Sequence, residues 1–117
     1  MRVLTLIKSD ENLGEPPASL WEGMEKELPA IDATITMVDT GALLPSGVSA
    51  ALVRSAGGRS TVLDGPFTEA KELVGGYSIC EVETFEQAVA AARAFVAIHE
   101  RYWPGWSGEA EVRQIAE

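Results

Sequence analysis

The sequence predicts a single α+β domain over residues 1–117, and three observations lead to this prediction. The length of 117 residues is typical of one domain. The content of 46% hydrophobic and 23% charged residues is that of a folded globular protein. Apolar runs with the spacing of strands alternate along the chain with apolar stripes that have the spacing of helices, as expected when one fold contains both.

The N-terminal part predicts a strand followed by a helix. Residues 2–8 contain an apolar run that polar residues end, which is typical of a strand. Residues 13–17 hold one glycine and two prolines and predict a loop. Ser19 and Glu22 have the spacing of a capping box, so we expect the helix to start at Ser19. Pro29 lacks an N–H and clashes with the preceding turn, so the helix should break, kink or restart there.

Residues 31–38 fit two patterns. Ile31, Ile35 and Val38 have helical spacing, whereas apolar residues at every second position from Ile31 to Met37 are typical of a strand. Gly41 would suit the end of a helix. We therefore expect a helix in this segment.

The middle of the chain predicts a β-hairpin. Residues 42–53 form its first strand, which should start irregularly because Pro45 cannot donate a hydrogen bond to a sheet. Gly57 and Gly58 tolerate positive φ and so predict a hairpin turn. The return strand is expected over residues 59–63.

A turn and a further strand are expected after the hairpin. Residues 64–67 predict a tight turn, because Asp, Gly and Pro all favour one. One helical turn is expected over residues 68–73, and Gly75-Gly76 should end it. A strand should then occupy residues 77–82.

The clearest helix is predicted over residues 84–99. Thr84 and Gln87 have the T-x-x-Q spacing of a capping box. The apolar residues of this segment recur every three or four positions and form one stripe, made of Phe85, Ala88, Val89, Ala92, Phe95, Val96 and His99. Residues 109–115 predict the final strand.

This order of elements, β-α-β-β-β-α-β, predicts a ferredoxin-like arrangement, in which an antiparallel sheet carries both main helices on one face. The other face of such a sheet would be bare, and a bare face is an exposed apolar patch or an interface. Two copies packed sheet to sheet would cover both bare faces. We therefore expect a homodimer.

Charge and cysteine content argue against several classes of protein. Nine Lys and Arg against eighteen Asp and Glu give a net charge of −9, which disfavours nucleic acids and anionic membranes as partners. No apolar stretch approaches the roughly 20 residues of a membrane span. Cys80 is the only cysteine, which fits a reducing compartment, so we expect a cytoplasmic protein. With one histidine, one cysteine and no phosphate-binding glycine motif, we expect neither a metal nor a cofactor.

Residues 63–77, LDGPFTEAKELVGGY, carry a specific pattern: D-G-P-F after a strand, a T-E-A-K-E run, and G-G-Y at the start of the next strand. This pattern resembles the DGPF subgroup of the YciI-like (YCII-related) family. The resemblance covers most of the chain and is weakest over residues 14–40. It implies a dimeric α/β barrel of ferredoxin-like protomers, and it also implies a helix over residues 31–38.

The same resemblance implies two kinds of function. Proteins of this family are similar in fold to muconolactone isomerases and chloromuconolactone dehalogenases, and some members have been proposed to be enzymes built around a His–Asp pair. Genes of the DGPF subgroup often accompany genes of extracytoplasmic-function sigma factors, which implies a regulatory association. This chain has no histidine in its N-terminal half, so the His–Asp pair cannot be carried over.

Four residues are candidates for chemistry, each with a structural alternative. Asp64 is either the carboxylate of an Asx-turn or a preorganised catalytic group. Tyr77 is either a core or interface residue or a ligand-binding ring with a weakly acidic hydroxyl. His99 is either a packed histidine bonded to the backbone or a general base beside a pocket. Cys80 has no base next to it in sequence, so we expect a core residue rather than a nucleophile.

Five further residues are candidates for ligand binding. Glu69 and Glu72 belong to the family pattern and follow a turn, where they are either solvated residues near the start of a short helical segment or ligand-facing residues. Tyr102, Trp103 and Trp106 flank the end of the second helix. These aromatic side chains either plug the end of the barrel, contact a second protomer, or line a pocket beside His99.

Two hypotheses about function follow. The first is a homodimer that binds a small molecule, or acts on one, in a cleft near Asp64, Tyr77 and His99. As an enzyme it would carry out cofactor-free proton transfer or lyase or isomerase chemistry, with His99 as the base and Asp64 as an orienting group or acid. The alternative is a non-catalytic regulatory or accessory protein associated with an extracytoplasmic-function sigma factor.

Overall fold

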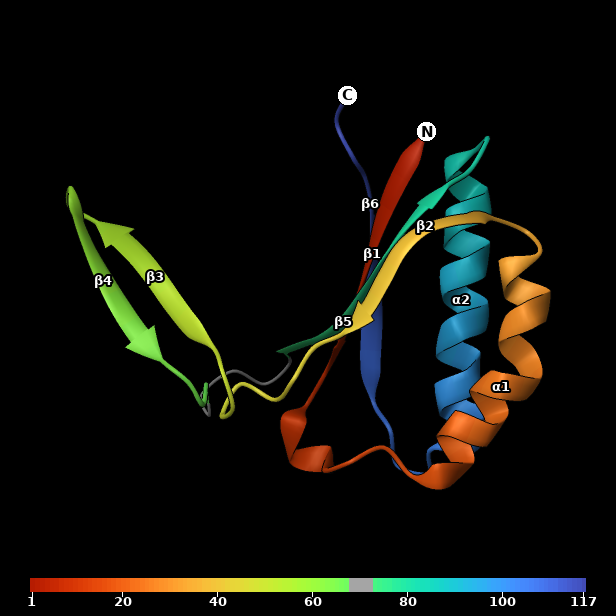
Figure 1. Ribbon diagram of the computed structural model, residues 1–117, viewed down its shortest axis with the longest axis horizontal. Helices are drawn as coiled ribbons and strands as arrows, with labels where there is room; N and C mark the ends of the chain where they lie inside the picture. Colours follow the sequence, from red (N-terminus) through yellow and green to blue (C-terminus); the bar gives the residue numbers. More distant parts are fainter. Residues whose placement is uncertain (68–72) are drawn as a thin grey trace.

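The computed structural model describes residues 1–67 and 73–117. This part of the chain contains six strands, two main helices and one short 3₁₀ helix (Figure 1). In chain order they are β1 (Arg2–Ser9), η1 (Glu11–Leu13), α1 (Ala18–Asp32), β2 (Thr36–Ala42), β3 (Ala51–Ala56), β4 (Arg59–Asp64), β5 (Leu73–Glu81), α2 (Phe85–Tyr102) and β6 (Gly108–Gln114).

Four of the strands form the main sheet. Their order is β2-β5-β1-β6, and each neighbouring pair is antiparallel. Helices α1 and α2 pack against each other and lie together on one side of this sheet (Figure 1). The expected α+β class is therefore confirmed, and the four strands with their two crossover helices are consistent with the ferredoxin-like arrangement.

The register of the central strands separates the two faces of the sheet. Val3 pairs with Cys80, and both are buried beneath the helices in a core that also contains Val82 and Ala88. Side chains alternate across a sheet, so the neighbouring pair Leu4 and Ile79 points to the opposite side. We call this opposite side the open face. It carries Leu4, Leu6, Tyr77 and Ile79 from the two central strands.

The helix expected over residues 31–38 is wrong. Helix α1 ends at Asp32, and strand β2 begins at Thr36 and forms an edge of the main sheet. The strand-like alternation was the correct signal in this segment. The register shifts between Met37 and Asp39, and this bulge interrupts the alternation in sequence.

The strand expected over residues 42–53 is also wrong in its first part. Strand β2 ends at Ala42 and β3 starts only at Ala51. The hairpin itself is confirmed, and Gly57 and Gly58 form its turn with φ of 59° and 77°. However, β3 and β4 form a separate two-stranded sheet, which projects away from the side of the main sheet that lacks helices (Figure 1).

Helix α1 differs from the prediction in how it starts, and it continues past Pro29. The residue before it is Pro17, which offers no capping side chain, and the Ser19 hydroxyl donates instead to the carbonyl oxygen of Tyr102 at 2.6 Å. The capping box expected at Ser19 is therefore wrong. Pro29 lies inside α1 without ending it, and the helix continues to Asp32.

The C-terminal elements agree with the sequence except at one glycine pair. The Thr84–Gln87 capping box is present, with Gln87 N–H donating to Thr84 Oγ1 at 3.4 Å and Thr84 N–H to Gln87 Oε1 at 3.1 Å. Strand β6 lies where the final strand was expected. Gly75 and Gly76 sit within β5 rather than ending a helical turn, and residues 68–72 of that expected turn are outside the described residues.

Candidate functional site

The open face holds a pair of polar side chains beside an apolar strip. The Tyr77 hydroxyl on β5 donates a hydrogen bond to Asp39 Oδ2 on β2 at 2.9 Å. The ring of Tyr77 lies over Gly41, since a Cβ placed on Gly41 would be 2.8 Å from Tyr77 Cε1. The bulge in β2 puts Asp39 opposite Ile79 and Gly41 opposite Tyr77, so both residues share the face of the tyrosine ring.

The carboxylate of Asp39 changes the acidity of its partner. The hydrogen bond from Tyr77 to Asp39 raises the pKa of the phenol, and the negative charge of Asp39 adds to this effect. Tyr77 therefore remains a protonated donor at neutral pH. The Thr40 hydroxyl donates to the carbonyl oxygen of Tyr77 at 2.9 Å, which ties the two strands together at the same point.

Charged pairs border this apolar strip. Arg2 donates to Glu81 at 3.0 Å, and Lys8 donates to Glu111 at 2.6 Å. Arg113 lies 3.7 Å from the other Glu111 oxygen. The hydrogen bond from Lys8 is the largest of the effects that lower the pKa of Glu111. The open face thus has an apolar centre and a charged border, which is the common composition of a protein interface.

A hollow lies at the base of the hairpin, where Asp64 is found. It has a volume of about 470 Å³ and is lined by residues 46–51 together with Asp64 and Gly65. Among the described residues the Asp64 carboxylate has no hydrogen-bond partner. The Asx-turn expected at this position is therefore not formed with any described amide.

A serine holds the turn after β4 in place of Asp64. Ser46 is buried, and its N–H and Oγ donate to the two carboxylate oxygens of Glu11 at 2.6 and 2.7 Å. The N–H of Phe67 donates to Ser46 Oγ at 3.0 Å, and that of Gly65 donates to the Ala50 carbonyl at 2.9 Å. A Cβ on Gly65 would overlap the carbonyl oxygen of Ser46, so this position requires glycine.

His99 is packed against the backbone and aromatic side chains. The residue is 5% exposed, and its Nδ1 hydrogen-bonds the Phe95 carbonyl oxygen at 3.0 Å. The centroid of its ring lies 4.7 Å from the ring centroid of Trp106. Burial lowers the pKa of His99, and the hydrogen bond to the Phe95 carbonyl offsets this only in part. His99 does not line the hollow beside Asp64.

The aromatic residues at the end of α2 have packing contacts of their own. The ring of Tyr102 lies against Gly23 of α1. Its hydroxyl hydrogen-bonds Glu27, and this hydrogen bond is the largest of the effects that lower the pKa of the Glu27 carboxyl. Arg101 also donates a hydrogen bond to Glu27. Trp103 is half-buried, and its N–H donates to the His99 carbonyl at 2.9 Å.

The structure does not bring the three expected cleft residues together. His99 belongs to a helix on the covered side of the sheet, whereas Tyr77 points to the open face. Asp64 lies at the base of the separate hairpin. Glu69 and Glu72 lie outside the described residues. Cys80 is in the core, and burial raises the pKa of its thiol.

Asp39 is the residue of this site that sequence reasoning missed. The helix predicted over residues 31–38 leaves Asp39 outside any expected strand. The alternation that ends at Met37 was the available signal, and it points to a strand whose next residues include Asp39.

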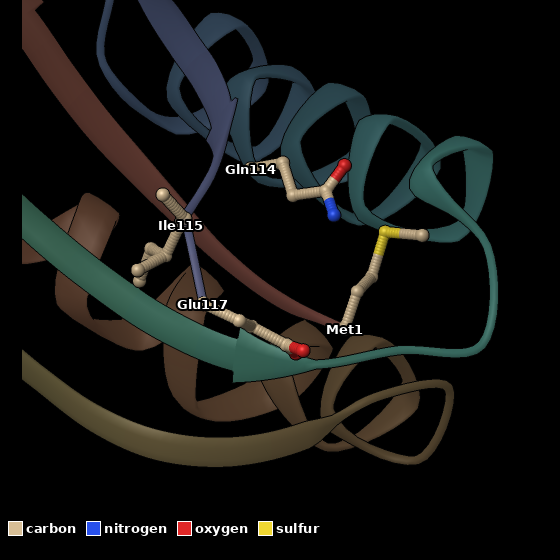
Figure 2. A pocket seen from close by; sticks show the side chains of 5 residues that line it. Met1, Gln114, Ile115 and Glu117 are labelled. Carbon is tan, nitrogen blue, oxygen red and sulfur yellow. The ribbon is translucent and has the colours of Figure 1, made fainter.

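A further hollow of about 460 Å³ lies where the two ends of the chain meet. It is lined by Met1 and residues 114–117, and Figure 2 shows the side chains of Met1 and Gln114 beside it. None of the expected site residues lines this hollow. Among the described residues no cluster of three or more His, Cys, Asp or Glu could hold a metal ion. Within the same residues no helix is long and apolar enough to cross a membrane.

The topology and the open face define an α+β protein of the kind that carries its helices on one side of an antiparallel sheet. Residues 1–103 match the family model of the YCII-related domain. The chain therefore belongs to the YCII-related family. No curated protein matches it significantly.

Proposed function

We propose that this protein, as one YCII-related domain of the DGPF subgroup, is a cytoplasmic homodimer that binds a small molecule on the open face of its sheet. The observation that carries the proposal is the Tyr77–Asp39 pair. A hydrogen-bonding phenol and a carboxylate lie side by side on a sheet face without helices, next to the apolar side chains of Leu6 and Ile79. Binding sites combine apolar surface with a few oriented polar groups in this way.

The homodimer follows from the uncovered face. Its apolar strip with a charged border has the composition of an interface, and a second open face of the same kind would cover it. Two such faces in contact form the dimeric α/β barrel that the DGPF resemblance implies. The Tyr77–Asp39 pair of each copy would then lie between the two sheets, shielded from bulk water.

The chemistry of the pair indicates the kind of ligand. The tyrosine ring offers a flat apolar surface, and the carboxylate of Asp39 accepts hydrogen bonds or faces a positive charge. The net charge of −9 disfavours a polyanion. We therefore favour a planar or apolar molecule with a hydrogen-bond donor. If turnover is found, Tyr77 and Asp39 are the residues to test for proton transfer, in place of Asp64 and His99.

Native mass spectrometry of the purified protein tests this proposal. We expect a dimer that retains a small molecule, with the added mass lost in Tyr77→Phe and in Asp39→Ala. Tyr102→Phe is the matched control, because it removes the only other tyrosine hydroxyl and should keep the added mass. A dimer without any added mass would overturn the binding function and favour the sigma-factor accessory alternative.

A further inference from the structure

We infer that the β3–β4 hairpin is an arm that binds a second copy of this chain, with Arg54 and Arg59 meeting carboxylates of that copy. This inference rests on the homodimer proposed above and adds to it a second contact region. We call residues 51–64 the arm.

The arm has no partner for its apolar side chains within the described chain. Its two strands contact each other extensively and share no extensive contact with any other described element. Val53 and Val62 face each other across the strands and are 73% and 67% exposed. Residues 43–63 hold six of the eleven large hydrophobic residues that are exposed in the described chain. An isolated two-stranded hairpin is marginally stable in water, so this arm needs a surface to cover it.

The surface area of the protomer indicates how large that missing contact is. The accessible surface is 7986 Å², whereas a compact monomer of this mass exposes about 6,200 Å². The radius of gyration is 15.8 Å, against about 13.4 Å for a compact domain of this length. The excess of surface, about 1,800 Å², exceeds the roughly 800 Å² that each partner buries in a standard interface.

The position of the arm points to the copy that covers the open face. In Figure 1 the main sheet lies between the helices and the arm, so the arm is on the side of the open face. Each strand of the arm has six residues and therefore spans about 20 Å. A second copy seated on the open face would lie beside the arm and within its reach.

Charge also selects a second copy as the partner. The only charged residues between positions 43 and 67 are Arg54, Arg59 and Asp64, so this segment has a net charge of +1 and the rest of the chain one of −10. Arg54 is opposite Thr61 and Arg59 is opposite Ala56. This register places both arginines on the face of the arm that carries exposed Leu63, opposite to the face of Val53 and Val62. A basic arm on an otherwise acidic protein is attracted to the body of another copy.

The base of the arm is held in place by hydrogen bonds. Glu11 binds Ser46 just before β3, and Ser46 binds the N–H of Phe67 just after β4. Both ends of the arm therefore connect to one network anchored on the 3₁₀ helix. This arrangement aims the arm in a fixed direction, which lowers the entropy lost when it binds.

Zero-length carbodiimide cross-linking tests the inference, because this reagent joins amines to carboxylates in direct contact. The arm has no lysine, so Arg59→Lys supplies an amine while keeping the charge. Copies labelled with ¹⁴N and ¹⁵N are mixed, allowed to exchange and cross-linked. We expect cross-links that join the arm of one label to an acidic peptide of the other label. The control Arg93→Lys, at an exposed position of α2, should give no mixed-label cross-link at residue 93.

Charge reversal provides the second measurement. Arg54→Glu with Arg59→Glu should raise the dissociation constant of the dimer about tenfold at low salt, and less at high salt. Lys26→Glu with Arg93→Glu changes the net charge equally at exposed positions outside the arm and should have a smaller effect. A stable dimer without mixed-label arm cross-links, or an equal effect of both double variants, overturns the arm contact and leaves the proposed function standing. A monomer by light scattering overturns both.

Discussion

The hydroxyl of Tyr77 donates a hydrogen bond to Asp39 across two neighbouring strands, over a glycine that leaves room for the ring. This contact joins β5 to the edge strand β2 on the face that no helix covers. It brings an aromatic ring, a protonated donor and a carboxylate together in one place.

Asp39→Asn should lower the pKa of Tyr77 toward the ordinary tyrosine value of 10.0, because both the hydrogen bond to the carboxylate and its negative charge raise that pKa in the native protein. Absorbance titration of the two tyrosines measures this directly. Glu27→Gln is the control, since Glu27 raises the pKa of Tyr102 instead. An unchanged titration in Asp39→Asn would contradict the pairing.

Gly41→Ala should destabilise the fold by about 1–3 kcal/mol, because the added methyl group would overlap the ring of Tyr77. Gly75→Ala is a matched control in the same sheet, where the nearest atom to a new Cβ is 4.0 Å away. Urea denaturation compares the free energies of unfolding of the two variants. Equal stabilities would mean that the ring does not lie on Gly41.

Ser46→Ala should cost about 1–3 kcal/mol of unfolding free energy, because it removes the partner of Glu11 Oε2 and of the Phe67 N–H, while the backbone N–H of residue 46 still donates to Glu11 Oε1. Asp64→Ala should change stability by less than about 0.5 kcal/mol, since its carboxylate has no hydrogen bond among the described residues. Denaturant unfolding of both variants gives the comparison. A larger cost at Asp64 would restore the Asx-turn interpretation.

His99 should titrate below the ordinary histidine value of 6.5, because burial disfavours its charged form. The unfolded chain then binds a proton before the folded chain does, so the stability that His99 contributes is present above pH 6.5 and is lost as the pH falls through the lowered pKa. An NMR titration of this only histidine measures the pKa. His99→Gln should weaken the pH dependence of unfolding below pH 6.5, whereas a pKa at or above 6.5 would contradict the packed geometry.

Local signals predicted a large part of the fold. The capping box at Thr84 and Gln87 involves residues three apart, and the glycine pair at 57–58 defines its own turn. Each of these features depends on neighbours in sequence, so the pattern alone was sufficient. The same holds for the apolar run of residues 2–8, which forms β1 and includes the buried Val3.

The features that were missed depend on contacts between distant residues. The turn at Gly65 is held by Ser46, and Ser46 in turn by Glu11, which is 35 positions away. Asp39 reaches the open face only because a bulge shifts the register of β2 against β5. Tertiary packing likewise decides whether a hairpin joins the main sheet or leaves it, and the hydrophobic pattern of the sequence does not indicate which of the two occurs.

The molar mass in solution tests most directly the claim that the open face is covered by a second copy. Light scattering of the wild-type protein at micromolar concentration should give about twice the 12.5 kDa of one chain. Leu6→Arg, which places a charge in the apolar strip of the open face, should shift the population toward the monomer. A stable, folded wild-type species of 12.5 kDa would contradict the account.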